Sequence, residues 1–280
     1  MRRSSQVLVV LLMLVASVAM TSSPSRANHD GSPHVLTWNM CNSSKAPCGH
    51  NGTNVPAVKL VEWIEEAQVK PMAIALQEVC EPSINYLYDE LVGPGGYGYL
   101  GNMVITATAN STCHLHGNAI FWLGGCFGGN FPTSCSSAVV YNSQAGAEGD
   151  NDTRAWICGR GGFPAHVSCS THLTHKNGNS EQVAGAQSEE YRAWMEFYRA
   201  ITPMVVPMGD FNMAPNKLAL WNATWLEADD PLWRATHDSE GKIDYIYIPD
   251  AQCRPRLGEI HATNVSDHHR YYGFPKSAPC

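Results

Sequence analysis

Acidic, amide and histidine residues lie at or just past several apolar runs of this chain. They are Asn39, Glu78, His172, Asp210, Asn212, Asp244, Asp267 and His268. The ends of strands are places where a rigid sheet can aim side chains into one cleft. Carboxylate and amide oxygens are hard ligands that suit Mg²⁺, Mn²⁺ or Ca²⁺, and histidines exchange protons near neutral pH. The set therefore indicates metal-assisted phosphoryl chemistry.

The hydrophobic pattern predicts the elements that would position these residues. Apolar or alternating runs predict strands over 34–38, 72–76, 118–123, 164–173, 204–208 and 243–248. Apolar residues at helical spacing predict helices over 56–69, 84–91 and 180–201. Pro207 is irregular within its strand, because proline removes a donor from the ladder. Strands interspersed with helices favour a mixed α/β (α+β) layered fold.

The N-terminal segment has the features of a secretory signal peptide. Arg2 and Arg3 precede an apolar run over 7–20, and a small-residue cleavage site follows at 25–27. The apolar run is too short for a membrane span, which needs about 20 residues. We therefore expect a signal peptide over 1–27, a single domain over 28–280, and an extracellular, secreted protein.

Composition places the chain among globular proteins, since 44% of its 280 residues are hydrophobic and only 15% are charged. Removing the three arginines of the signal peptide leaves 15 basic and 25 acidic residues, a formal charge of −10. A protein that binds DNA by phosphate neutralisation alone would be more basic. Any polyanion must therefore be bound through a local patch or through metal cations.

Ten cysteines, all outside the signal peptide, predict up to five disulfides formed in an oxidising compartment. Local spacing suggests the pairs Cys41–Cys48, Cys126–Cys135 and Cys158–Cys169, and leaves Cys80–Cys113 and Cys253–Cys280. A zinc site is disfavoured, because the chain has neither close C-x-x-C pairs nor an HExxH motif beside its paired histidines.

An ordered set of short motifs spans most of the chain. In order they are TWN (37–39), LQEV (76–79), GNAIF (117–121), DTRA (152–155), STHL (170–173), GDFN (209–212), IDYI (243–246) and SDH (266–268). In this order they resemble the endonuclease/exonuclease/phosphatase superfamily, whose fold is that of pancreatic-type deoxyribonuclease. The resemblance implies a four-layer α/β/β/α sandwich, in which two mixed β-sheets pack face to face with helices outside.

The resemblance also implies ligands for a cation and for the substrate. Glu78 would be the principal ligand of a divalent cation, with Asn39 and Asp267 beside it. Mg²⁺ or Mn²⁺ would be the cofactor, with Ca²⁺ as a structural ion. Arg154 and Asn118 would bind the substrate phosphate, since a planar guanidinium can bind two oxygens.

The remaining residues would handle protons and charge. Asp210 and Asn212 would orient the attacking water or the scissile phosphate. His268, fixed by Asp244, would activate water or stabilise the pentacovalent phosphorane, and His172 would protonate the leaving oxygen. These roles fit the needs of a phosphodiester, whose hydrolysis requires an in-line water and a proton for the departing alkoxide.

Two departures from the family pattern bear on the site. The family has an acid near the start of the strand at 117–121 that supports the second histidine, whereas residues 114–118 here contain none. The usual Pro-Val after the SDH motif is replaced by residues 269–272, His-Arg-Tyr-Tyr. The acidic partner of His172 is therefore left open, and the rim of the site differs.

These observations predict a monomeric, metal-dependent phosphodiesterase that cleaves DNA as an endonuclease. A sphingomyelinase-type phospholipase C is the alternative, and it would bind membrane lipid through an apolar loop at 93–112 or 127–131. A nuclease-like toxin subunit that acts with partner proteins is a third possibility. An inositol-phosphate phosphatase would need more clustered lysine and arginine than the chain carries.

Overall fold

The structure is a computed structural model of the 280-residue chain. It describes residues 34–42, 48–67, 69–108, 113–126, 135–144, 153–162, 165–175, 180–202, 204–228, 233–249 and 258–273. The predicted signal peptide and the predicted pair Cys253–Cys280 lie outside the described residues. All of the described elements belong to one compact unit, Gly31–Cys280.

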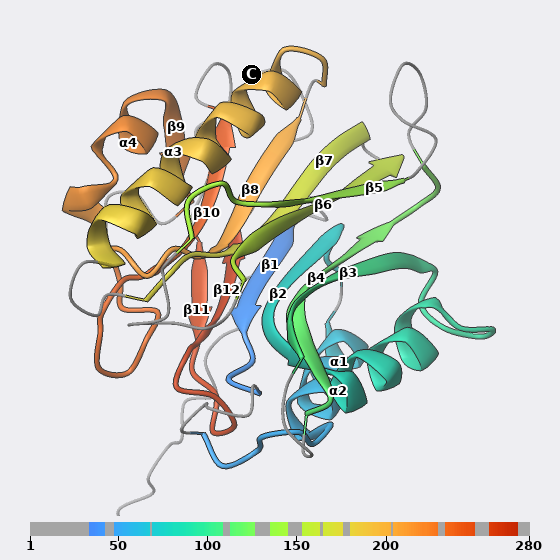
Figure 1. The fold of residues 1–280 in the computed structure, drawn as a ribbon. Helices are drawn as coiled ribbons and strands as arrows, with labels where there is room; N and C mark the ends of the chain where they lie inside the picture. The colour runs from blue at the N-terminus through green and yellow to red at the C-terminus, as the bar shows by residue number, and fades with distance from the viewer. Residues whose placement is uncertain are drawn as a thin grey trace, which may run out of the picture. The chain divides into compact units, whose positions relative to one another are not determined.

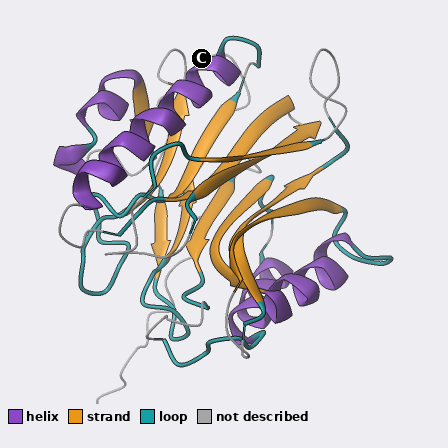
Figure 2. Ribbon diagram, in the orientation of Figure 1, coloured by secondary structure: helices purple, strands orange, loops and turns teal. Residues whose placement is uncertain are grey.

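The described elements are runs of strands interrupted by a few helices (Figures 1 and 2). The strands are β1 Val35–Asn39, β2 Ala73–Cys80, β3 Tyr99–Thr108, β4 Leu115–Leu123, β5 Ser136–Val140, β6 Ala155–Gly162, β7 Ala165–His172, β8 Val205–Asp210, β9 Trp225–Glu227, β10 Asp244–Pro249, β11 Glu259–His261 and β12 Arg270–Gly273. The helices are α1 Val55–Glu66, α2 Glu81–Leu87, α3 Ser180–Arg199 and α4 Ala219–Thr224, with a π-helical turn Tyr88–Val92 and a 3₁₀ turn Pro215–Lys217.

The strands form two six-stranded sheets. The first has the order β11-β12-β1-β2-β4-β3, and the second has the order β5-β6-β7-β8-β10-β9. Both sheets are mixed, because β1 and β2 pair in parallel, as do β7 and β8, while the other pairs are antiparallel. Helices cover the outer faces, α1 and α2 on the first sheet and α3 and α4 on the second (Figure 1). The predicted four-layer sandwich is confirmed.

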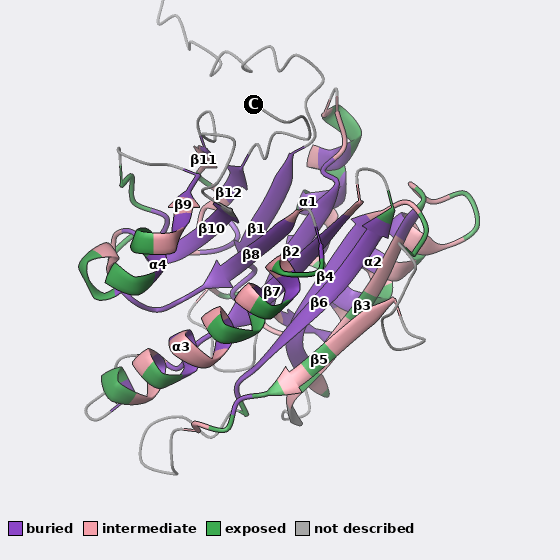
Figure 3. Ribbon diagram, turned by 90° about the horizontal axis from the view of Figure 1, so that it is seen from above, coloured by how far each residue is buried: buried purple, intermediate pink, exposed green. Residues whose placement is uncertain are grey.

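Three apolar clusters correspond to the three interfaces between these layers. One lies between the sheets and includes Val35 and Ile120 from the first sheet and Met208 from the second. The outer face of the first sheet packs with Leu60 and its neighbours on α1, and the outer face of the second sheet packs under α3. Figure 3 shows the result, with buried strands between helices that are buried on one side only. Burial on both faces explains why the central strands have continuous apolar runs.

Pro207 lies within β8, where the sequence suggested an irregularity. Hydrogen bonds to β7 flank it, from Val167 N–H to the Met204 carbonyl and from Leu173 N–H to the Asp210 carbonyl, both 2.9 Å. This alternation turns the ring nitrogen of Pro207 away from β7 and toward β10. The ladder with β10 covers Met208 to Asp210 and so does not include Pro207. The proline therefore removes no bond to β7, and it coincides with the end of the β10 ladder.

Several strands were not predicted from the sequence. One of them, β6, contains Gly159 and Gly161, at which a Cβ atom would come within 2.1 Å of the Trp122 ring and 2.0 Å of the His166 ring. The glycines make room for these large rings. They also interrupt the alternation of apolar and polar side chains from which a strand is predicted. Half of the segment 93–112, considered as a membrane loop, forms strand β3, so the described part of this segment does not support that interpretation. The other candidate loop, 127–131, lies outside the described residues.

Four predicted disulfides are present: Cys41–Cys48, Cys80–Cys113, Cys126–Cys135 and Cys158–Cys169. Among the described residues, no helix combines the length and the apolar character that a membrane span requires.

Candidate active site at the strand ends

The predicted site residues converge because of the strand topology. The carboxyl ends of parallel neighbours meet at one edge of a sheet, and the loop before β12 arrives at the same edge, since β12 runs antiparallel to β1. The residues that this brings together are Asn39 at the end of β1, His172 at the end of β7, Asp210 at the end of β8, Asp244 at the start of β10, and Asp267 and His268 before β12.

A β-bulge directs Glu78 toward the site. The ladder between β2 and β4 shifts register between Leu76 and Val79, which leaves Gln77 and Glu78 in the bulged segment. Glu78 has a φ of 52°, an uncommon value for a residue with a side chain. Such bulges redirect side chains, and local strain of this kind concentrates at functional sites. The neighbouring Gln77 instead donates to Ser170 Oγ of β7 at 3.0 Å, a hydrogen bond that ties the two sheets together.

Asp210 is the centre of the arrangement. Its Oδ2 lies 3.4 Å from His172 Nε2 and 3.6 Å from His268 Nε2, and it accepts a 3.0 Å hydrogen bond from Asn39 Nδ2. Its other oxygen accepts from the backbone N–H of Asn212 at 2.8 Å. One buried carboxylate thus connects two strands, the loop before β12 and the turn after β8.

His268 is held in one orientation by three groups. Its Nδ1 lies 2.9 Å from Asp244 Oδ2. Its backbone N–H donates to Ser266 Oγ at 3.0 Å, and its carbonyl accepts from Trp38 Nε1 at 3.1 Å. The side chain of Asp244 is therefore placed where the sequence predicted it, behind the imidazole of His268.

The buried carboxylates control the charge of His268. Burial alone would lower its pKa, but Asp244 and Asp210 outweigh that effect and raise the pKa to about 10. Burial raises the pKa of Asp210 to about 7, and the positive charge of His268 acts in the opposite direction. At neutral pH, the site therefore combines an imidazolium with an adjacent carboxylate whose affinity for a proton is enhanced.

His172 has the opposite character. Burial lowers its pKa well below 6.5, and the positive charge of Arg154 lowers it further. The imidazole is therefore neutral in the free site at pH 7. Its acidic neighbours, which the sequence left open, are Asp210 and the carboxylate of Glu78, whose Oε1 lies 4.0 Å from His172 Nε2.

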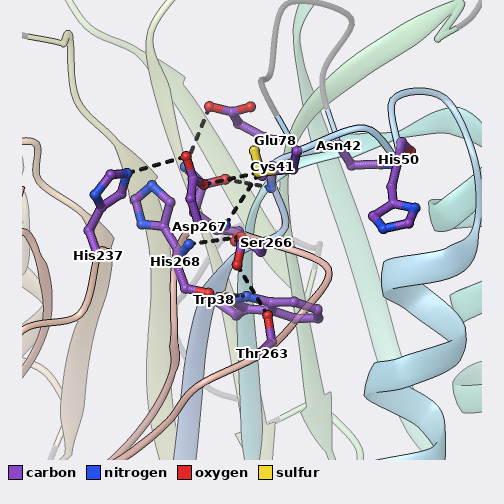
Figure 4. The surroundings of a disulfide bond; sticks show 12 residues. Trp38, Cys41, Asn42, His50, Glu78, His237, Thr263, Ser266, Asp267 and His268 are labelled. Carbon is purple, nitrogen blue, oxygen red and sulfur yellow. Dashed lines mark hydrogen bonds and ion pairs between the residues drawn. A yellow bond between two sulfur atoms is a disulfide. The ribbon is translucent and has the colours of Figure 1, made fainter. Parts of the chain in front are cut away.

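Two carboxylates of the site are open, and the other two are enclosed. The side chains of Glu78 and Asp267 are 21% and 26% exposed, whereas those of Asp210 and Asp244 are each 1% exposed. Figure 4 shows Glu78 and Asp267 above the end of β1. Partly exposed carboxylate oxygens are ligands suited to Mg²⁺ or Mn²⁺ that retain water and bind phosphate. The donor chemistry at this position therefore fits a divalent cation.

Asn39 orients the carboxylates of Asp210 and Glu78. Its Oδ1 accepts the backbone N–H of Cys41 at 2.9 Å, which places its Nδ2 toward Asp210 and, at 3.4 Å, toward Glu78 Oε1. A carbonyl oxygen has two lone pairs, so Oδ1 keeps one for a further partner. Asn39 thus holds Glu78 in place, and its predicted role as a metal ligand stays a prediction.

The predicted phosphate-binding residues lie beside each other on facing sheets. Asn118 on β4 donates from Nδ2 to the carbonyl of Ala155, the first residue of β6, at 2.8 Å, and Arg154 directly precedes β6. Both side chains are buried, with Arg154 7% exposed. Its positive charge acts on His172, which places it near the site. Their contact with a phosphate stays a prediction.

Sequence reasoning missed two features of the site. His237, from a hairpin before β10, contacts Asp267 Oδ2 through Nε2 at 3.3 Å. The Cys41–Cys48 disulfide was predicted, but its position was not. The backbone N–H of Asp267 lies 3.3 Å from Cys48 Sγ, and the backbone N–H of Cys41 donates to Asn39 Oδ1. Figure 4 shows the surroundings of this disulfide, with Cys41 and Asp267 labelled. No local motif signalled the contacts of Asp267 with His237 and Cys48, because each joins segments that are distant in sequence.

Comparisons with known proteins agree with this architecture. The family model described as "Endonuclease/Exonuclease/phosphatase family" matches residues 36–268. A search of curated proteins found no match.

Similar solved structures share the fold at low sequence identity. The endonuclease/exonuclease/phosphatase from Bacteroides vulgatus is 15% identical, with a TM-score of 0.62, over 86% of this chain and 97% of its own. D. rerio TDP2, complexed with a single-strand DNA product, is 13% identical with a TM-score of 0.60, over 87% and 98%. A mannosyl-6-phosphatase of Bacteroides thetaiotaomicron is 13% identical with a TM-score of 0.58, over 86% and 98%. With the family model matching most of its length, the chain belongs to the endonuclease/exonuclease/phosphatase family, whose members are hydrolases of phosphoester bonds.

Proposed function

We propose that this chain is a secreted, divalent-metal-dependent phosphodiesterase that cleaves DNA as an endonuclease. The observation that carries the proposal is the shared contact of His172 and His268 with Asp210, next to the open carboxylates of Glu78 and Asp267. This arrangement supplies proton-transfer groups and cation ligands at one point, which is what hydrolysis of a phosphodiester requires.

Glu78 and Asp267 would hold the cation, and Asn39 would orient Glu78. The bound cation would neutralise the negative charge that spreads over the phosphate oxygens during the reaction. Arg154 would add a fixed positive charge for the same purpose.

The protonation states assign roles to the buried groups. His268 is protonated at neutral pH, so it acts as a fixed cation that stabilises the phosphorane. Asp210, with its raised pKa, accepts the proton of the attacking water while Asn212 holds its other oxygen. His172 is neutral in the free site, but an anionic phosphate beside it would raise its pKa and allow it to protonate the departing alkoxide.

Two observations favour a nucleic acid over a lipid as the substrate. D. rerio TDP2, a structural neighbour, binds a single-strand DNA product. An exposed apolar group is formed by Trp194 and Phe197 on α3 and by Ile201 just after it, and it lies at the wrong end for a lipid enzyme. It is at the end of α3 that leads to the start of β8, whereas Asp210 ends β8. Enzymes that act on membranes need their apolar surface beside the site.

The test uses purified chain lacking residues 1–27, with plasmid DNA and sphingomyelin liposomes offered in parallel. Each substrate is incubated with Mg²⁺, with Mn²⁺ and with EDTA. We expect nicking of the plasmid that requires metal and is lost in His268→Ala. His261→Ala, a half-buried histidine on β11, is the matched control and should remain active.

Other outcomes would redirect or reject the proposal. Hydrolysis of the liposomes while the plasmid stays intact would favour the sphingomyelinase-type phospholipase C over the endonuclease. Nicking that survives EDTA would reject metal dependence. Inactivity on both substrates, followed by activity when partner proteins are added, would favour the toxin-subunit alternative.

A further inference from the structure

We propose that His237 is a positioning residue, which holds the carboxylate of Asp267 in the orientation that binds the divalent cation. This inference rests on the proposed function. His237 Nε2 lies 3.3 Å from Asp267 Oδ2, and the imidazole is 9% exposed while the carboxylate is 26% exposed. Figure 4 shows the ring of His237 pointing to Asp267 from a segment outside the predicted motifs.

Backbone contacts determine which nitrogen of His237 carries the proton. The backbone N–H groups of Ser239 and Glu240 both donate to Nδ1, at 3.1 and 3.0 Å. A nitrogen that accepts hydrogen bonds cannot itself carry a proton in the ring plane. The proton of the neutral imidazole is therefore on Nε2, which faces Asp267. The N–H of His237 therefore faces Asp267 Oδ2, and its nitrogen lies 3.3 Å from that oxygen.

The same argument excludes His237 as a metal ligand. His237, Asp267 and His268 each have a ligand atom within 4.8 Å of the others, a geometry that could hold a metal ion. Coordination through Nε2 would require the proton to move to Nδ1, where two backbone N–H groups already point. The group of three is therefore a support for Asp267 and does not form a second metal centre.

The segment that carries His237 is fixed to the loop that carries Asp267. Asp238 N–H donates to the carbonyl of Asp267 at 3.0 Å, and His269 N–H donates to the carbonyl of Thr236 at 2.7 Å. The ring of His237 also packs edge-on against the ring of His268, with centroids 4.6 Å apart. Donor and acceptor are thus held by the same backbone ladder, so the contact requires little further ordering.

The consequence is measurable as metal affinity. Hydrogen bonds to the ligands of a metal typically change its affinity by about 10- to 100-fold. We expect His237→Leu to weaken Mn²⁺ binding by about that factor. We expect His237→Gln, which keeps an N–H donor at the Nε2 position, to bind within about 3-fold of the wild type, a change well below that range.

The experiment titrates Mn²⁺ into the purified proteins by isothermal calorimetry, without substrate. His261→Leu is the matched control and should bind as the wild type does. Circular dichroism establishes that each variant is folded. In the wild type, ¹⁵N-resolved NMR of the histidine rings should show the His237 proton on Nε2, which is a readout independent of metal.

The outcomes separate this inference from the proposed function. Wild-type protein that binds no Mn²⁺ would overturn the metal centre, and the role of His237 with it. Wild-type binding with unchanged affinity in folded His237→Leu would overturn the role of His237 alone. A proton found on Nδ1, or a His237→Gln variant as weak as His237→Leu, would also overturn it.

Discussion

His172 and His268 contact the same oxygen atom of Asp210, at 3.4 and 3.6 Å, although one histidine ends β7 and the other precedes β12. The two rings differ in charge, because burial lowers the pKa of His172 whereas nearby carboxylates raise that of His268. Asp210 therefore lies between a neutral imidazole and an imidazolium. In the proposed mechanism, this asymmetry would distinguish the group that donates a proton to the leaving oxygen, His172, from the group that stabilises charge, His268.

Asp210→Asn should lower kcat for plasmid cleavage by about 10²- to 10⁴-fold, the range for loss of an acid–base group. Asparagine keeps the size of the side chain and an oxygen for the N–H of Asn212, so the fold should persist. Initial rates at saturating metal provide the measurement. Asp238→Asn, an exposed acid in the neighbouring hairpin, is the control. A loss of less than about 3-fold, far below the expected range, would remove Asp210 from the chemistry.

The pH dependence of kcat/KM should have two limbs. Activity falls as pH drops through about 7, where Asp210 becomes protonated, and it falls again as pH rises toward about 10, where His268 loses its proton. A bound cation shifts both limbs to lower pH. Asp244→Asn removes a negative charge that raises the pKa of His268, so its basic limb should move to lower pH. A basic limb that does not move would show that His268 does not control it.

Loss of the Cys41–Cys48 disulfide should weaken metal binding. The bond lies between segments that contact Asp267 and Asn39. Two double variants make a matched pair, Cys41→Ser/Cys48→Ser and Cys126→Ser/Cys135→Ser. Each opens a short disulfide-closed loop, whose cysteines are separated by 7 residues in the first and 9 in the second. Both double variants should lose about 2–3 kcal/mol of stability on the chain-entropy model. Calorimetry with Mn²⁺ should show weaker binding only in the first. Equal affinities in the two variants would contradict the expectation.

Gly209→Ala should destabilise the fold and disorder Asp210. Gly209 has a φ of 141°, and a Cβ atom there would lie 2.1 Å from the backbone oxygen of Thr171. Strain of this kind costs on the order of 1–3 kcal/mol or more. Gly185→Ala, where a Cβ atom meets nothing within 4 Å inside α3, should instead stabilise by about 0.5–1 kcal/mol. Thermal unfolding compares the two, and a neutral Gly209→Ala would refute the steric argument.

The sequence predicted those parts of the fold in which burial produces a regular period. The helices α1 and α3 and the strands β7 and β10 show it, whereas the strands β1, β2, β4 and β8 were predicted from continuous apolar runs. Edge strands were missed, since they bury too little surface to show a pattern, as in β5. Strand β6 was missed for a different reason, because its glycines serve the side chains of neighbouring strands.

The ordered motifs located the predicted ligands and proton-transfer groups, because those residues lie at the ends of strands. They could not locate His237, whose link to Asp267 depends on backbone contacts between segments about 30 residues apart in sequence, a tertiary feature that local pattern does not encode. They also could not indicate that Asn39 turns its N–H groups toward the carboxylates, since Cys41 determines that orientation.

The position of the Cys41–Cys48 bond also bears on when the protein acquires activity. Disulfides form in oxidising compartments and are rare in the cytosol. A chain still inside the producing cell would lack the link that holds the segments beside Asn39 and Asp267 together. Under the proposed function, the nucleic acids of that cell would then be protected until the chain is exported and oxidised, so that synthesis and activity would be separated by a single covalent step.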